Sequence, residues 1–202
     1  MNIITYNVRG LERAVKWAAI RRLVKKEKLD MICIQETKKE SIERSMCQAM
    51  WGDTTVSWEV QQAINSAGGL LCMWTENTFT LQRKVMGNGF ICLTGLWINE
   101  ALQVHIVNIY SPCDTQSKRI LWENIKQLKT ANQGELWCIM GDFNIRDPVK
   151  RMGVCQRGME EKVSGNLMNG LMIWRWWKCH GLEENLHDLD PMALQEASWI
   201  DF

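Results

Sequence analysis

Several apolar stretches of the sequence end in a polar side chain that can bind a metal ion or a phosphate group. NIITY is followed by Asn7, and MICIQ is followed by Glu36. Tyr110 ends LQVHIVNIY, while GDFN places Asp142 and Asn144 two residues apart directly after LWCIM. Because a rigid scaffold often holds functional side chains where its strands end, we expect these five residues to form one site.

The residue types in this set suit the chemistry of phosphate esters. The carboxylates of Glu36 and Asp142 are hard oxygen ligands of the kind that Mg²⁺ prefers. Asn7 and Asn144 can ligate or orient without adding charge, and the hydroxyl of Tyr110 can donate a hydrogen bond to a phosphoryl oxygen. Together they could neutralise charge on a phosphoryl group while a metal ion and Asp142 position an attacking water.

Four of these residues also have a purely structural interpretation. Asn7 could form a turn, and Asp142 could close an Asx-turn with its own backbone. Glu36 could begin a solvated helix, and Tyr110 could be a packed aromatic with a satisfied hydroxyl. These interpretations do not predict that all four follow apolar strands in this order, so the set as a whole favours a site. By contrast, we interpret His105, which alternates along a strand inside LQVHIVNI, as a structural histidine.

The elements that must position these residues follow from the hydrophobic pattern. Short apolar or β-branched runs predict strands at residues 2–6, 31–35, 55–60, 69–74, 79–85, 90–98, 102–109 and 136–140. Helical periodicity predicts helices at residues 11–28, 40–50 and 115–130, and Pro112 and Asp114 mark the start of the last one.

Composition limits the class of protein. The 202 residues suit one domain, or one domain with a tail, and 46% apolar with 23% charged residues excludes a disordered chain. No apolar run approaches the ~20 residues of a membrane helix, and MNIITYNVRG is not a signal peptide. Residues 1–162 carry 22 Lys and Arg against 17 Asp and Glu, whereas residues 163–202 carry 2 against 6. We expect an intracellular protein outside the membrane, and its mildly basic body is compatible with a phosphate-rich partner.

The eight cysteines do not predict a disulfide framework or a zinc site. Cys33, Cys72, Cys92 and Cys138 each lie inside an apolar run, where a thiol packs as a small hydrophobic group. The sequence has neither a CxxC pair nor a Cys/His cluster with zinc spacing. Reduced thiols in a reducing compartment are therefore expected.

One family shares the series TYNVRG, ICIQETK, SAGGLLCMW, VNIYSP and IMGDFNIRDP. The series resembles the endonuclease/exonuclease/phosphatase superfamily over roughly residues 1–162, and within it the endonuclease domain of LINE-type retrotransposons, particularly those of plants. The resemblance implies an α/β (α+β) fold, a four-layer αββα sandwich of two mixed sheets flanked by helices. It also implies cleavage of phosphodiesters or phosphomonoesters with Mg²⁺ or Mn²⁺, and no small-molecule cofactor.

The resemblance also implies a role for each matched residue. Asn7 and Glu36 hold the metal, and Asp142 orients or activates the attacking water. The phosphate or DNA contacts come from Tyr110, Asn144 and Arg9. The implied partner is DNA, which a LINE endonuclease nicks in the nucleus, while the oligomeric state is left open.

The matching motifs stop near residue 162. The family has a later strand with an Arg-Leu-Asp-like motif and a terminal Ser-Asp-His motif, whose histidine is the main general acid/base. Neither motif is found in residues 163–202, where His180 and His187 lack the strand context. We therefore expect a C-terminally truncated sandwich of marginal stability, whose tail provides no strand in register and whose activity is low or absent. A catalytically dead nucleic-acid-binding module is the alternative, and a phosphomonoesterase of the same fold is a weaker one.

A shifted reading frame offers an origin for the tail. The shifted register joins the third base of each codon to the first two bases of the next. In this register, the stretch from Met168 can encode EWIDDLEVVEVPWVGRKFT, one further residue and FRPNGTARSKLDRF. These segments resemble the continuation of a plant LINE endonuclease. We hypothesise that residues from 163–166 onward are a frameshifted remnant, and the alternative is a divergent tail that forms a terminal helix.

Overall fold

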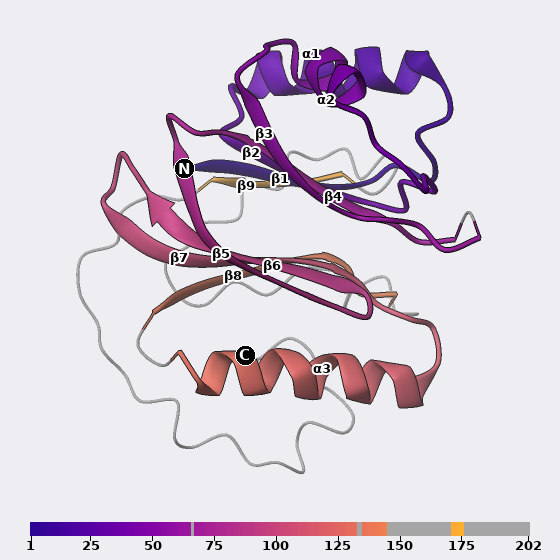
Figure 1. The fold of residues 1–202 in the computed structure, drawn as a ribbon, viewed down its shortest axis with the longest axis vertical. Helices are drawn as coiled ribbons and strands as arrows, with labels where there is room; N and C mark the ends of the chain where they lie inside the picture. The colour runs from indigo at the N-terminus through magenta and orange to yellow at the C-terminus, as the bar shows by residue number, and fades with distance from the viewer. Residues whose placement is uncertain (66, 133–134, 145–170, 176–202) are drawn as a thin grey trace.

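The computed structural model describes residues 1–65, 67–132, 135–144 and 171–175, which form two face-to-face β-sheets with helices on both outer faces (Figure 1). In chain order the elements are β1 (Asn2–Asn7), α1 (Ala14–Glu27), β2 (Met31–Gln35), α2 (Arg44–Trp51), β3 (Val56–Gln61), β4 (Leu70–Thr75), β5 (Phe79–Gly87), β6 (Phe90–Trp97), β7 (Leu102–Tyr110), α3 (Thr115–Thr130), β8 (Leu136–Asp142) and β9 (Leu171–Arg175).

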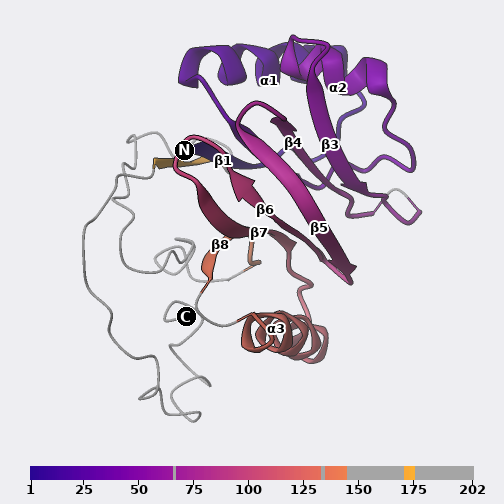
Figure 2. The ribbon, with the colours of Figure 1, turned by 60° about the vertical axis from the view of Figure 1, so that its left-hand side comes forward.

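The two sheets are both mixed. The first has the strand order β3-β4-β2-β1-β9 and the second the order β5-β6-β7-β8. β1 and β2 are parallel, as are β7 and β8, and the other neighbouring strands are antiparallel. Figures 1 and 2 show α1 and α2 over the outer face of the first sheet and α3 over the outer face of the second. The predicted four-layer αββα sandwich of two mixed sheets is confirmed.

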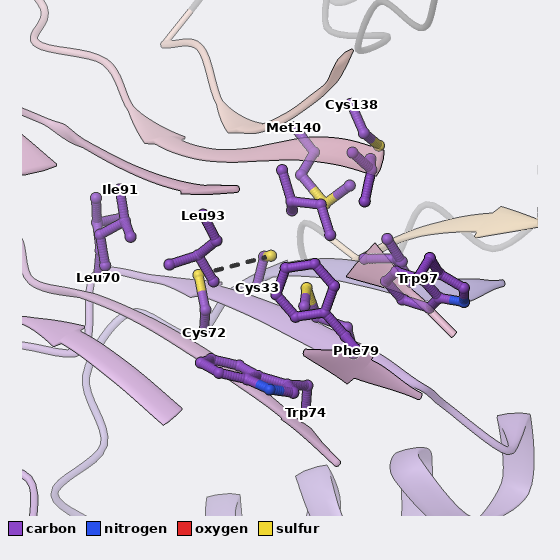
Figure 3. Close-up of a cluster of buried hydrophobic side chains, with 14 residues drawn as sticks. Cys33, Leu70, Cys72, Trp74, Phe79, Ile91, Leu93, Trp97, Cys138 and Met140 are labelled. Atoms are coloured by element: carbon purple, nitrogen blue, oxygen red, sulfur yellow. Dashed lines mark hydrogen bonds between the residues drawn. The ribbon is translucent and has the colours of Figure 1, made fainter. Parts of the chain in front are cut away.

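The core between the sheets is built from the side chains that point inward, which are every second residue of a strand because successive side chains point to opposite faces of the sheet. Figure 3 shows this cluster, in which Trp74 meets Phe79 edge to face with ring centroids 5.8 Å apart. Cys33 and Cys72 lie side by side in it with their sulfur atoms 3.8 Å apart, as free thiols. The prediction that these cysteines pack as core residues is confirmed.

The sequence pattern predicted the first residue of α3 correctly but not that of α2. At α3 the side chain of Asp114 accepts a hydrogen bond from the Ser117 N–H at 2.8 Å, which confirms the predicted N-cap. In contrast, α2 begins at Arg44 and not at residue 40, since Glu43 is extended with φ −86° and ψ 158° and forms the N-cap. No helix in the described part of the chain is long and apolar enough to cross a membrane.

The edge of the first sheet corrects one expectation about the tail. Residues 171–175, with the sequence LMIWR, form β9 and pair antiparallel with β1, so that Arg175 lies opposite Asn2 and Leu171 opposite Tyr6. The prediction that the tail provides no strand in register was wrong for this segment. The open edge of β1 offers unpaired backbone groups, and Ile and Trp favour extended structure. The domain boundary expected at residue 162 lies outside the described residues.

Candidate active site

The ends of β1, β2, β7 and β8 bring the predicted site residues together. The strand pairing places Asn7 opposite Gln35 and Tyr110 opposite Asp142. These are two parallel strand pairs, one from each sheet. Their carboxyl ends meet at the same edge of the sandwich, which is the rim formed by the strand ends, since Asn7 contacts Asp142. The polar side chains lie where the apolar core between the sheets ends.

Asn7 connects both sheets through its side-chain amide. Its Nδ2 donates to Glu36 Oε1 at 2.8 Å and to Asp142 Oδ2 at 2.6 Å. Its Oδ1 accepts the Arg9 N–H at 3.0 Å, which fixes the orientation of the amide, while Arg9 itself is exposed. One amide group thus holds two carboxylates from elements that are 106 residues apart in the sequence.

Tyr110 contributes a neutral hydroxyl to the same edge. Burial raises its pKa to about 12, and the negative charge of Glu36, a hydrogen bond to Glu36 and the charge of Asp142 act in the same direction. The phenol therefore keeps its proton at physiological pH and remains a hydrogen-bond donor.

Asp142 and Asn144 form a locally fixed turn. The Asn144 N–H donates to Asp142 Oδ1 at 3.0 Å, which leaves Asp142 Oδ2 facing Asn7. The Asn144 amide donates to the Ser111 carbonyl at 2.5 Å, and the Asn144 carbonyl accepts from Lys118 Nζ at 2.8 Å. The structural interpretation of Asp142 as an Asx-turn is therefore correct for one carboxylate oxygen, while the other oxygen belongs to the site.

The backbone around the site is unusual for non-glycine residues. Arg9, Glu36, Lys38 and Asn144 all have φ between 49° and 53°, in the left-handed region. Such conformations cost on the order of 1–3 kcal/mol each and persist where surrounding contacts enforce them. The Gly10 N–H, for example, donates to the Glu36 carbonyl at 2.7 Å. The polar side chains thus emerge from tightly turned and cross-linked strand ends.

A glycine pair explains the SAGG part of the sequence. The carbonyls of Gly68 and Gly69 accept the N–H groups of Lys38 and Thr37 at 3.0 and 3.1 Å. Both glycines have positive φ, and a side chain on Gly69 would collide with the hydroxyl of Thr37. The pair therefore allows its loop to lie close against the chain that follows Glu36.

Two lysines near the site were missed by the sequence reasoning. Lys38 Nζ lies 3.8 Å from Glu36 Oε2. Lys16 Nζ donates to the carbonyls of Val8, Arg9 and Gly10 at 2.8, 3.1 and 2.8 Å, and so holds the loop after β1. Lys38 is the last residue of the motif ICIQETK, but nothing in the local pattern marks Lys16, since its partners come from a preceding loop.

Glu36 and Asp142 are the residues of the set that could hold a hard divalent cation. The two carboxylates already converge on a single partially positive group, the amide nitrogen of Asn7. Within the described ranges, no group of three or more His, Cys, Asp or Glu residues could hold a metal. Asn7, which we predicted as the second metal ligand, has its amide nitrogen toward the two carboxylates and its oxygen toward the Arg9 N–H.

The other features considered for chemistry lie elsewhere. His105 is buried, hydrogen-bonds to Thr94 and Glu135 and stacks on Trp137 with ring centroids 4.1 Å apart, which confirms that it is structural. His180 and His187 lie outside the described residues. An open cavity beside β3 and the β4–β5 turn is lined by residues such as Arg44, and it contains none of the site residues.

Comparison with known proteins places the chain in a family. A family model described as the Endonuclease/Exonuclease/phosphatase family matches residues 4–179. No curated protein matches the chain. Among solved structures, the AP endonuclease LMAP from Leishmania major is 18% identical with a TM-score of 0.54, over 71% of this chain and 55% of that one.

Two further solved structures share the fold at similar levels. An AP endonuclease from Archaeoglobus fulgidus has a TM-score of 0.56 and 16% identity, over 74% of this chain and 60% of that one. A truncated TDP2 from Caenorhabditis elegans has a TM-score of 0.55 and 15% identity, over 79% of this chain and 68% of that one. The chain spans little more than half the length of the Leishmania protein. At these identities the likeness shows the fold alone.

Proposed function

This chain belongs to the endonuclease/exonuclease/phosphatase family, and we propose that it is a nuclease-type phosphodiester hydrolase that binds Mg²⁺ or Mn²⁺ together with DNA. The observation that carries the proposal is the convergence of Glu36 and Asp142 on the amide of Asn7. Two carboxylates that face one point favour a cation there. A cation at that point can in turn attract an anionic phosphodiester.

The chain's own residues then have distinct tasks. Glu36 and Asp142 hold the cation, which when bound supplies charge neutralisation and Lewis acidity. Tyr110, whose pKa of about 12 keeps it protonated, donates a hydrogen bond to a phosphoryl oxygen. Asp142 orients the attacking water, and Asn144 fixes Asp142 through the hydrogen bond from its N–H.

Positively charged side chains near the site support the binding of a polyanionic ligand. Arg9 is exposed on the loop after β1, and Lys38 follows Glu36 at the same edge. Lysine and arginine that neutralise backbone phosphates provide most of the sequence-independent affinity for DNA. We propose that both residues contact the phosphate backbone on either side of the reacting group.

We further propose that turnover is slow. The described site contains no histidine that could act as general acid or base, and such a group contributes roughly 10²–10⁴ in rate. The series ICIQETK and IMGDFNIRDP supports DNA of the kind nicked by a LINE-type endonuclease as the substrate, and the nucleus as its location. The fold shared with two AP endonucleases is consistent with a nuclease.

Nicking of supercoiled plasmid tests the proposal. With Mg²⁺ or Mn²⁺ the protein should convert supercoiled DNA to the open circle, and Glu36→Ala should abolish this. Glu40→Ala is the matched control, because Glu40 is exposed and lies only four residues further along the chain. If DNA binding without nicking persists both in EDTA and in Glu36→Ala, the protein is instead a binding module without a catalytic site. Faster hydrolysis of a small phosphate monoester than of DNA would indicate a phosphomonoesterase.

A further inference from the structure

Two buried amides lie beneath the site, one from each sheet. Gln35 ends β2 and is 1% exposed, and Asn108 of β7 is fully buried. The Gln35 Nε2 donates to Asn108 Oδ1 at 2.5 Å across the space between the sheets. The surrounding core is apolar and made of sulfur, aliphatic and aromatic side chains.

The amide pair is well satisfied by its surroundings. Gln35 Nε2 also lies 2.8 Å from Thr5 Oγ1 and 3.1 Å from the Cys33 carbonyl, so its two hydrogens have three acceptors within reach. Asn108 Nδ2 lies within 3.2 to 3.5 Å of the carbonyls of Ile34 and Leu71 and of Cys72 Sγ. Burying an amide costs free energy unless it is hydrogen-bonded. An apolar pair would fill the same space without that requirement, so the amides call for a role other than stability.

The position of the pair points to that role. Gln35 directly precedes Glu36, and Asn108 lies two residues before Tyr110 on the same face of β7. Each amide is therefore joined by a stiff strand end to a residue of the candidate site. Glu36 follows a strand of the first sheet, and Tyr110 ends a strand of the second.

We propose that the Gln35–Asn108 pair is a positioning element that sets the distance and register between the two halves of the site. This inference rests on the proposed function of that edge. Apolar packing is non-directional and permits small shifts of one sheet over the other. A short hydrogen bond between two strand ends restricts such shifts where Glu36 must meet Tyr110 and Asp142.

A double replacement separates positioning from stability. In Gln35→Met/Asn108→Leu both amides become apolar groups of similar size, and such paired replacement can be nearly neutral for stability. Because the buried hydroxyl of Thr5 loses the hydrogen bond from Gln35, we expect a modest fall in the free energy of unfolding that leaves the protein folded. We expect the affinity for Mn²⁺, measured by electron paramagnetic resonance, to fall at least tenfold.

A second readout does not depend on metal. The chain has two tyrosines, Tyr6 and Tyr110, so ¹³C-labelled tyrosine gives two ring signals that Tyr6→Phe assigns. In the metal-free double variant the Tyr110 signal should shift or broaden, while the Tyr6 signal stays in place. Gln61→Met is the matched control, because Gln61 Nε2 also links the sheets, donating to the Gly87 carbonyl at 2.7 Å, but from β3. It should leave both the Mn²⁺ affinity and the Tyr110 signal unchanged.

The outcomes distinguish this inference from the proposed function. A folded double variant with wild-type Mn²⁺ affinity and an unchanged Tyr110 signal would overturn the positioning role. If the wild type itself does not bind Mn²⁺, the proposed function fails, and the Tyr110 signal alone decides whether the pair positions that residue. If the double variant does not fold, Gln35→Asn decides in its place. It keeps an amide but is one methylene shorter, so it should move the Tyr110 signal, and an unmoved signal would refute the role.

Discussion

Replacing Asn7 with leucine tests whether one amide holds the two carboxylates of the site. Leucine has nearly the same shape as asparagine but cannot form any of the three hydrogen bonds that Asn7 makes. Two of these bonds go to the carboxylates of Glu36 and Asp142, and the third comes from the Arg9 N–H. The variant therefore removes polarity at the centre of the site with little change in volume.

The expected magnitude follows from these three bonds. Hydrogen bonds to charged groups contribute about 1.5–3 kcal/mol each and neutral ones about 1 kcal/mol, so their sum is roughly 4–7 kcal/mol. Asn7 and Glu36 are only partly buried, so water can replace much of what is lost. We therefore expect a loss of about 2–3 kcal/mol, or roughly 30- to 150-fold in the ratio of folded to unfolded protein.

The assay is urea unfolding followed by tryptophan fluorescence in metal-free buffer. Asn2→Leu is the matched control, because Asn2 begins the same strand and its side chain makes one exposed bond, to the Lys28 carbonyl at 3.3 Å. We expect the control to change the free energy of unfolding by less than about 0.5 kcal/mol. If Asn7→Leu changes stability no more than this control, the amide does not hold the carboxylates and the described site geometry is wrong.

Three further predictions concern Tyr110, Lys118 and the coding DNA. Because the pKa of Tyr110 is raised to about 12 in the folded protein, the contribution of Tyr110 to stability should be complete below pH ~10 and lost as the pH rises through about 12. Urea midpoints measured between pH 9 and 12 should show this loss of stability. The variant Tyr110→Phe should not show the loss. Lys118→Met removes the hydrogen bond to the Asn144 carbonyl, so it should reduce the free energy of unfolding by about 1 kcal/mol and slow plasmid nicking. The control Lys126→Met, on an exposed face of α3, should change neither quantity. Equal nicking by the two variants would show that Lys118 does not support the site. Sequencing the coding DNA over codons 155–202 should reveal the LINE-like residues in the shifted frame, and a shifted frame that does not spell them refutes the frameshift hypothesis.

The sequence predicted most elements because their patterns are local. β2 and α3 have the predicted bounds, since a continuous buried run and an Asp N-cap with helical periodicity each define an element without help from elsewhere. The start of α2 was placed too early, because its N-cap is Glu43, a residue type that gives no N-cap signal in the sequence. β9 was missed because its pairing depends on the open edge of β1, which no pattern within residues 171–175 records.

The site shows the same division between local and long-range information. Glu36, Tyr110 and Asp142 could be chosen because each follows an apolar run, and residue type then suggested the chemistry. The sequence could not show that the amide nitrogen of Asn7 would face both carboxylates. It also could not show that Gln35 and Asn108 would meet beneath them, since these partners are 73 residues apart and on different sheets.

Titration with Mn²⁺, followed by electron paramagnetic resonance, tests most directly whether this edge of the sandwich is a metal site. The wild-type protein should bind one Mn²⁺ per chain, and Glu36→Gln/Asp142→Asn should lose that binding. Glu40→Gln should retain it, because the exposed Glu40 carries the same charge outside the site. Wild-type protein that binds no Mn²⁺, or a double variant that binds it as tightly as the wild type, would contradict the account.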